Sequence, residues 1–153
     1  MALTGGCICG KVRYEIKDDP LFVHACHCTD CQRFSGSAFV VLLGVVKADF
    51  EVHGETSTVT NPTPSGSGYD AHFCPNCATI IWSKYHFVDI PVISLRGGTL
   101  DEPEMAQPAY HIFVRSKQPW VILPDDTPVF DGWLEPTEAW SKTTLNKIEE
   151  MTQ

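Results

Sequence analysis

The feature of this sequence that most limits its possible folds is the placement of its seven cysteines. They form three clusters, Cys7-Ile8-Cys9, Cys26-His27-Cys28-Thr29-Asp30-Cys31 and Cys74-Pro75-Asn76-Cys77. In an extended strand, Cys-x-Cys places both sulfurs on the same side, and Cys-x-x-Cys does the same through a tight turn. Each pair is therefore half of a tetrahedral zinc site, and the fold must bring together clusters that are far apart along the chain.

The number of thiols suggests how they divide. A structural zinc site takes four protein ligands, whereas a reactive zinc site takes three and leaves the fourth position to water or substrate. The economical division assigns the closed structural site to Cys7, Cys9, Cys74 and Cys77. The open catalytic site then consists of Cys26, Cys28 and Cys31. The sequence thus predicts two zinc ions per chain, one of which clamps the N-terminal strand to a distant hairpin.

Other interpretations of the cysteines stay open. Free thiols are often inert and buried, although seven clustered ones fit that description poorly. The central triplet can instead be a redox centre without metal. His27 or His24 can supply a fourth ligand and close the central site, but in an extended stretch His27 points away from its cysteine neighbours.

Length and composition predict the number of domains, and the N-terminal sequence and the apolar runs predict the cellular compartment. A chain of 153 residues with 43% hydrophobic and 20% charged residues is expected to form one zinc-binding domain over residues 1–153. No basic stretch followed by an apolar run begins the sequence, and the longest apolar run, Ala38 to Val46, is too short to cross a bilayer. We expect a cytoplasmic protein with no membrane partner. Thiols stay reduced there, which favours metal binding over disulfides.

The charge balance limits the partners. The formal net charge is −8, and no run of Lys or Arg is present, so nucleic acid is an unfavourable partner. The same charge repels anionic small molecules. An anionic substrate would therefore need local help from one of five cations, Lys11, Arg13, Arg33, Arg96 or Lys117.

Short runs rich in β-branched and aromatic residues, separated by turn signals, predict an all-β protein of antiparallel strands. The predicted strands are Lys11 to Ile16, Ala38 to Val46, Glu51 to His53, Thr56 to Thr60, Thr79 to Trp82, Val92 to Leu95 and His111 to Val114. Two helical segments interrupt this pattern. Thr29 to Ser35 is expected to form a helical turn ended by Gly36, and residues 138–151 are expected to form a short C-terminal helix.

Five segments in order carry a family resemblance. They are GGCICGKVRY at 5 to 14, HACHCTDCQRFSGSAF at 24 to 39, HFCPNCATIIW at 72 to 82, LRGGTLDEP at 95 to 103 and HIFVRSKQPW at 111 to 120. Together they resemble the glutathione-dependent formaldehyde-activating enzyme family, which also includes centromere protein V. The resemblance implies an Mss4-like fold, with antiparallel sheets and structural zinc at one end. It also implies the same two ligand sets that the thiol count suggests.

The resemblance implies a carbon–sulfur lyase like S-(hydroxymethyl)glutathione synthase. Its partners would be a small-molecule thiol, glutathione or similar, and an aldehyde such as formaldehyde. Arg33, Phe34, His86 and Arg96 are candidates to orient the substrate because they lie in or near the family segments. Ala78 stands where the family commonly has glycine, which predicts a slightly different turn rather than loss of metal.

Two other classes of function are compatible with the sequence. Related Mss4-like proteins act as binding modules or chaperones, and such a protein needs the closed zinc site but no open one. A thiol redox enzyme resembling methionine sulfoxide reductases would need a free cysteine instead of three ligands. The intact triplet favours the lyase, and zinc stoichiometry separates the three.

Overall fold

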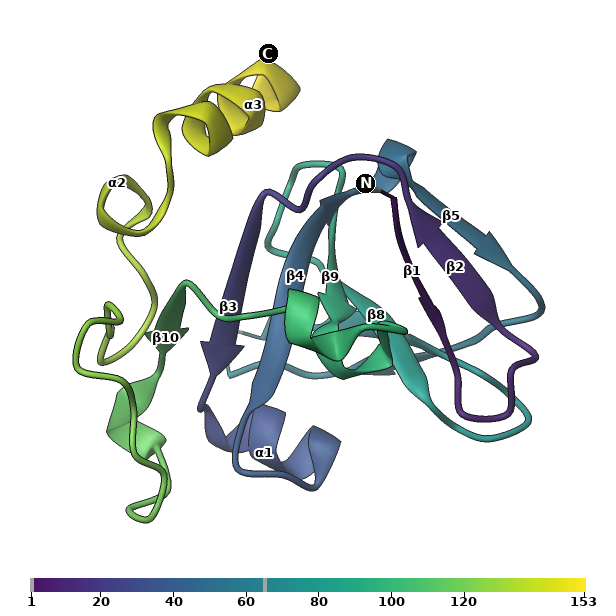
Figure 1. Ribbon diagram of the computed structural model, residues 1–153, viewed down its shortest axis with the longest axis horizontal. Coiled ribbons are helices and arrows are strands. Elements are labelled where there is room, and N and C mark those ends of the chain that lie inside the picture. The colour runs from purple at the N-terminus through teal and green to yellow at the C-terminus, as the bar shows by residue number, and fades with distance from the viewer. Residues whose placement is uncertain (1, 65) are drawn as a thin grey trace.

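Two β-sheets form the body of the protein in the computed structural model, which describes residues 2–64 and 66–153. The smaller sheet has the order β1-β2-β5, from Leu3–Gly6, Arg13–Ile16 and Phe50–His53. The larger sheet has the order β10-β3-β4-β9-β8-β7-β6. Its strands are β3 Phe22–Cys26, β4 Val40–Val46, β6 Ser57–Asn61, β7 Tyr69–Phe73, β8 Ile80–Tyr85, β9 Val92–Arg96 and β10 Tyr110–Ile112. The predicted all-β class is confirmed (Figure 1).

Strand pairing is antiparallel throughout both sheets except at one edge. There β10 pairs parallel to β3, with Tyr110 beside His24 and Ile112 beside Cys26. The strand pattern predicted neither this parallel pair nor the bounds of β1, β3 and β7, although the cysteine spacing indicated an N-terminal strand. Each of these strands is four or five residues long and contains Gly, His, Cys or Asp, residues that weaken a strand signal.

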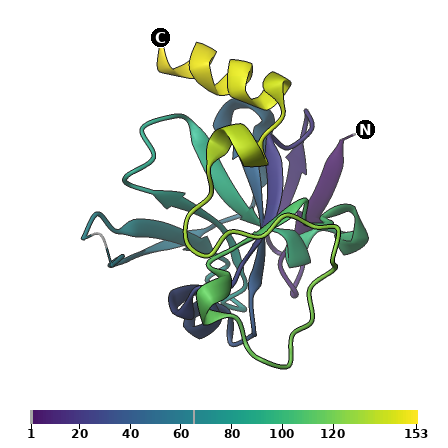
Figure 2. The same cartoon turned by 90° about the vertical axis from the view of Figure 1, so that its left-hand side faces the viewer.

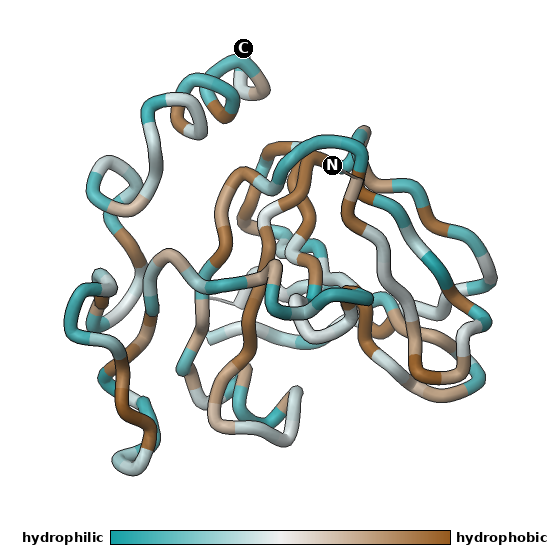
Figure 3. Tube along the Cα trace, viewed as in Figure 1, coloured by the Kyte–Doolittle hydropathy of each residue, from teal (hydrophilic) through white to brown (hydrophobic). Residues whose placement is uncertain are grey.

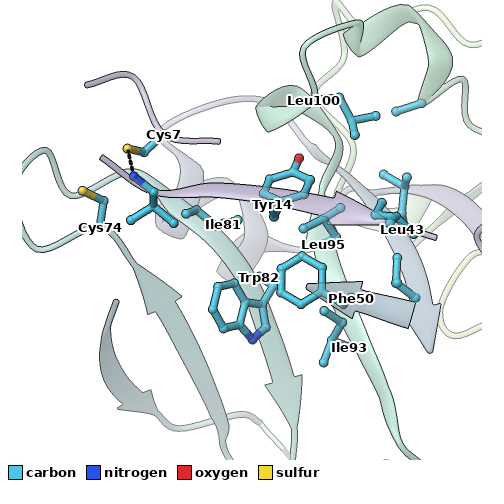
Figure 4. Packing of buried hydrophobic residues seen from close by; sticks show 14 residues of the cluster. Cys7, Tyr14, Leu43, Phe50, Cys74, Ile81, Trp82, Ile93, Leu95 and Leu100 are labelled. Atoms are coloured by element: carbon cyan, nitrogen blue, oxygen red, sulfur yellow. Dashed lines mark hydrogen bonds between the residues drawn. The ribbon is translucent and has the colours of Figure 1, made fainter. Parts of the chain in front are cut away.

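The main hydrophobic core lies between the two sheets. Tyr14 from β2 packs on Phe50 with ring centroids 5.5 Å apart, and Phe50 packs edge-on against Trp82 from β8 at 5.0 Å. Leu43 and Leu95 are fully buried beside them (Figure 4). Figure 3 shows the matching hydrophobic colour along much of β4. Cys7 and Cys74 belong to the same core cluster and lie together at one end of it (Figure 4), so this sheet packing positions two of the predicted metal ligands.

The segment after β10 runs along the outer side of the large sheet and ends in helix α3, Lys142–Thr152 (Figures 1 and 2). The predicted helix over 138–151 is wrong in its extent, because a separate turn, α2 at Pro136–Ala139, precedes α3. Trp140 between them is extended and Ser141 caps α3 by accepting a hydrogen bond from the amide of Thr144. Trp140 stacks on Phe22 and donates to the hydroxyl of Tyr110, so tertiary contacts interrupt the helix.

Short helical turns connect several strands. The one most relevant to the site is α1, Thr29–Ser35, which ends at Gly36 in the left-handed conformation as predicted. The 3-10 turns are Lys47–Asp49, Gly97–Thr99, Pro103–Met105 and Val114–Ser116. Within the described part of the chain, no helix has the length and apolar character needed to cross a bilayer.

Candidate metal centres

Four thiols, those of Cys7, Cys9, Cys74 and Cys77, come together where the β1–β2 turn meets the β7–β8 hairpin. The expectation that Cys7 and Cys9 share one face of a strand is wrong, because β1 ends at Gly6 and both residues lie in the following turn. That turn is closed by the amide of Gly10, which donates to the carbonyl of Cys7. The turn, rather than strand alternation, directs the two sulfurs to one point.

The geometry of this four-thiol group fits a tetrahedral zinc ion. The sulfurs all lie within 4.8 Å of one another, with Cys7 Sγ 3.5 Å from Cys9 Sγ and Cys9 Sγ 3.7 Å from Cys74 Sγ. Four thiolates at a zinc–sulfur distance near 2.3 Å would be roughly 3.8 Å apart. These separations are too long for a disulfide, and all seven cysteines are free thiols. The group therefore offers four ligands at the spacing that zinc requires.

Hydrogen bonds to the sulfurs favour the thiolate form. The amide of Val12 donates to Cys7 Sγ over 3.2 Å. The pKa of the Cys77 thiol is lowered to about 5 because the hydroxyl and amide of Thr79 donate to its sulfur. A thiolate, not a thiol, is the form that ligates zinc. Burial instead raises the pKa of the Cys74 thiol to about 11, so of the two hairpin thiols only Cys77 is favoured as a thiolate before a cation binds.

The second group consists of three thiols, Cys26, Cys28 and Cys31, whose sulfurs also lie within 4.8 Å of one another. Cys26 is the last residue of β3, Cys28 is the N-cap of α1, and Cys31 lies in the first turn of that helix. Cys26 and Cys31 are buried, whereas Cys28 is half-buried. In Figure 1, α1 lies below the ends of β3 and β4. The three sulfurs therefore come from a strand end and a helix start joined by only two residues.

The three thiols differ in acidity because they contact one another. Hydrogen bonds from Cys26 and Cys31 lower the pKa of the Cys28 thiol, and the amides of Cys31 and Asp30 lower it further. The Cys31 amide lies 3.3 Å from Cys28 Sγ. By the same contacts and by burial, the pKa of Cys26 is raised. Crowded thiols of this kind share protons unless a cation replaces them, so the donor set fits zinc.

Histidine does not join either group among residues 2–64 and 66–153. His27 is fully buried, and its Nε2 lies 2.9 Å from Nδ1 of His111. His24 stacks on Phe22 and lies 3.5 Å from the hydroxyl of Tyr110. The alternative in which His27 or His24 completes a fourth ligand is therefore not supported by their positions.

A polar network that sequence reasoning missed holds the three-thiol group in place. The side-chain amide of Gln32 donates to the carbonyls of His27 and Ser116, at 2.8 and 2.9 Å. Ser116 donates its hydroxyl to the same His27 carbonyl, and Gln118 donates to Gln32 Oε1. Gln32 follows a candidate ligand directly, but nothing in its spacing signals partners more than 80 residues away.

A pocket of about 470 Å³ lies against the C-terminal end of α1, the helix that carries Cys31 in its first turn. Its lining residues are Phe34, Ser35, Phe39, Val40, Val41, Ala78, Ile80, Arg96 and Gly98. Arg96 lies over the ring of Phe34 at 5.4 Å, and Phe34 contacts Tyr69 edge-on. Two of the candidate substrate-orienting residues, Phe34 and Arg96, are thus in the pocket. Of the others, Arg33 is exposed on α1 and His86 is paired with Asp70.

Ala78 has a φ of 60°, in the left-handed region where glycine is unstrained. The turn after Cys77 therefore keeps a glycine-type conformation despite the alanine. We expect Ala78→Gly to raise the free energy of unfolding by about 0.5–1 kcal/mol, since relief of the left-handed strain exceeds the added chain entropy. Thermal melts test this, with Ala38→Gly, at an ordinary φ, as the control that should lose stability. Loss of stability in both variants would contradict the prediction.

Comparisons with known proteins bear on the family and the fold of the chain. A family model described as "Glutathione-dependent formaldehyde-activating enzyme" matches residues 2–116. A curated relative from Halomonas elongata, named "Putative glutathione-dependent formaldehyde-activating enzyme", is 26% identical over 131 residues, which cover 80% of this chain and 82% of the relative. A crystal structure of a Rhodobacter sphaeroides protein is similar in fold, with a TM-score of 0.51 at 16% identity over 69% of this chain and 96% of that one.

Proposed function

Because the chain belongs to the glutathione-dependent formaldehyde-activating enzyme family, we propose that it is a zinc-dependent carbon–sulfur lyase acting on adducts of a small thiol and an aldehyde. The observation that carries the proposal is the group of three thiols, Cys26, Cys28 and Cys31, which contains no fourth ligand among the described residues. A binding module would need only the four-thiol group. An incomplete ligand set beside a pocket is instead typical of reactive sites.

In this proposal, Cys7, Cys9, Cys74 and Cys77 hold a structural zinc and Cys26, Cys28 and Cys31 hold a catalytic one. A zinc ion with an open position supplies Lewis acidity, which lowers the pKa of a thiol or polarises a carbonyl oxygen. The reaction itself is balanced without a redox partner. The thiol sulfur forms a bond to the aldehyde carbon, the carbonyl π bond breaks, and the thiol proton ends on the carbonyl oxygen.

Several hydrogen bonds around the three thiols support this proposal. Gln32 and Ser116 hold the carbonyl of His27, so the peptide between Cys26 and Cys28 is rigid. The amide of Cys31 holds Cys28 Sγ. Such a preformed site avoids reorganisation at the moment of reaction. The ring of Phe34 on α1 contacts Tyr69, and Tyr69 stacks on Tyr85, so the aromatic surface beside the helix continues onto strands β7 and β8.

Exchange spectroscopy tests the proposal directly. A panel of thiols against aldehydes, including glutathione with formaldehyde, is monitored with and without protein at matched pH. We expect the protein to raise the rate of adduct exchange roughly tenfold or more for its own substrate pair, which corresponds to about 1.4 kcal/mol of transition-state stabilisation. Cys28→Ser protein, which keeps the four-thiol group, is the matched control and should give the uncatalysed rate. Equal rates with parent, variant and buffer for every pair would rule out the lyase.

A further inference from the structure

We propose that Arg96 is the residue that binds a carboxylate of the substrate thiol and so determines how strongly the protein prefers the charged form of that thiol over its ester. This inference rests on the proposed lyase function of the three-thiol group and assigns a separate subsite to the neighbouring pocket. Arg96 differs from the other candidate cations in being buried with unpaired hydrogen-bond donors. The residue is only 9% exposed, and its Nε and Nη1 atoms are buried and have no hydrogen-bond partner.

The four other cations named as candidates to attract an anionic substrate are already engaged or lie in solvent. Arg13 is paired with Asp101, and Lys11 donates to the side-chain oxygen of Asn76. Lys117 donates to the carbonyls of Gln118 and Val121. Arg33 is exposed. Among the described residues, no carboxylate forms an ion pair with Arg96. Arg96 is therefore a buried cation that acts on the Cys31 thiol only through space and whose Nε and Nη1 donors are left for a ligand.

An unpaired buried guanidinium is costly for folding, because a charge taken from water needs a partner to offset its desolvation. Phe34 offsets part of this cost through its ring face at 5.4 Å, but it leaves the hydrogen-bond donors unused. The chain carries a net charge of −8, so a nearby acid would have been easy to supply. Among the described residues no acid forms an ion pair with Arg96, which is what a subsite for an external anion requires.

The sheet places Arg96 on the same side as the reacting thiols. Arg96 pairs with Leu42 across β9 and β4, and Cys26 pairs with Val40 two residues earlier on β4. Side chains two residues apart on a strand point to the same face. The Phe34 that covers Arg96 follows Cys31 by three residues on α1, about one helical turn. A ligand bound at Arg96 would thus have to span about the length of one helical turn to reach the three-thiol group.

The pocket wall indicates what such a ligand looks like. A guanidinium presents paired N–H donors that match the two oxygens of a carboxylate. Phe39, Val41 and Ile80 supply apolar surface in the pocket, and the space beside Gly98 is open. These features suit a carboxylate on a short, partly apolar stem that ends in the thiol.

Calorimetry tests the subsite without depending on turnover. The probes are S-methylglutathione, which carries carboxylates but no free thiol, and its diethyl ester, in which both carboxylates are neutral. In the zinc-loaded parent protein we expect the acid to bind about 10–100-fold more tightly than the ester, as for loss of a charge-assisted hydrogen bond. Arg96→Met should abolish that preference. Arg33→Met, which removes an exposed charge from the neighbouring helix, should keep it.

Equal affinity of acid and ester in the parent protein would overturn the subsite, and this comparison needs no variant to fold. Loss of the preference in Arg33→Met as well would also overturn it, because the effect would then be general electrostatics. The outcome for the lyase is separate. Carboxylate-dependent binding without faster adduct exchange would disprove the lyase and keep the subsite. Equal acceleration of adduct exchange for glutathione and its ester would keep the lyase and disprove the subsite.

Discussion

Cys74→Ser should yield insoluble or unfolded protein, whereas Cys28→Ser should remain folded. The two variants make the same chemical change, sulfur to oxygen, in different thiol groups. Cys74 is completely buried at the end of the core, and its sulfur lies 3.7 Å from that of Cys9, 65 residues away in the chain. The zinc that this group would hold therefore joins the two sheets.

The expected loss of folding free energy in Cys74→Ser follows from the contribution of structural zinc. In zinc-finger peptides the metal supplies on the order of 10 kcal/mol to folding, which is comparable to the whole stability of a domain, about 5–15 kcal/mol. Loss of one of four ligands removes most of that contribution and leaves buried thiols unpaired. Cys28, by contrast, is half-buried, and its neighbourhood is held by the hydrogen bonds of Gln32 and Ser116 regardless of metal.

Soluble yield, melting temperature and zinc content of both variants beside the parent measure the difference. Cys28→Ser should keep one zinc per chain, a melting temperature within a few degrees of the parent, and no thiol–aldehyde activity. Collapse of Cys28→Ser together with normal folding of Cys74→Ser would reverse the assignment of which group is structural.

The grouping of the thiols could be predicted from the sequence because coordination chemistry constrains it more tightly than strand geometry does. The four-plus-three division needs only the clustering of the seven cysteines and the ligand number of zinc. The thiols therefore group as predicted even though Cys7 and Cys9 lie in a turn and not on one face of a strand. Helix α1 was predictable for a similarly local reason, since Gly36 adopts the left-handed cap that ends it.

What the sequence could not provide depends on contacts between distant segments. The parallel pairing of β10 with β3 brings His111 beside the strand that ends in Cys26, and no local pattern encodes that register. The helix predicted through Trp140 is broken because the indole stacks on Phe22. Five cations were equal candidates in the sequence, and only their partners in the fold distinguish Arg96 from the rest.

Zinc content should be two per chain in freshly purified, reduced protein, and a chelator should remove the two ions in separate steps. A zinc held by the three-thiol group would have an open coordination position, so a chelator could bind the metal before any protein ligand leaves. The four-thiol group offers no open position, and two of its sulfurs, those of Cys7 and Cys74, are buried. We expect rapid loss of one zinc with an unchanged far-ultraviolet circular dichroism spectrum, and slow loss of the second together with unfolding.

Elemental analysis, thiol titration and circular dichroism followed over the same time course distinguish the remaining alternatives. Three newly reactive thiols in the fast step identify Cys26, Cys28 and Cys31 as the ligands released first. The Cys28→Ser variant is the control and should show only the slow step. One zinc in fresh parent protein, with three thiols already reactive, would mean that the central group is a metal-free thiol centre. The lyase proposal would then be wrong, while the four-thiol clamp would still account for the single ion.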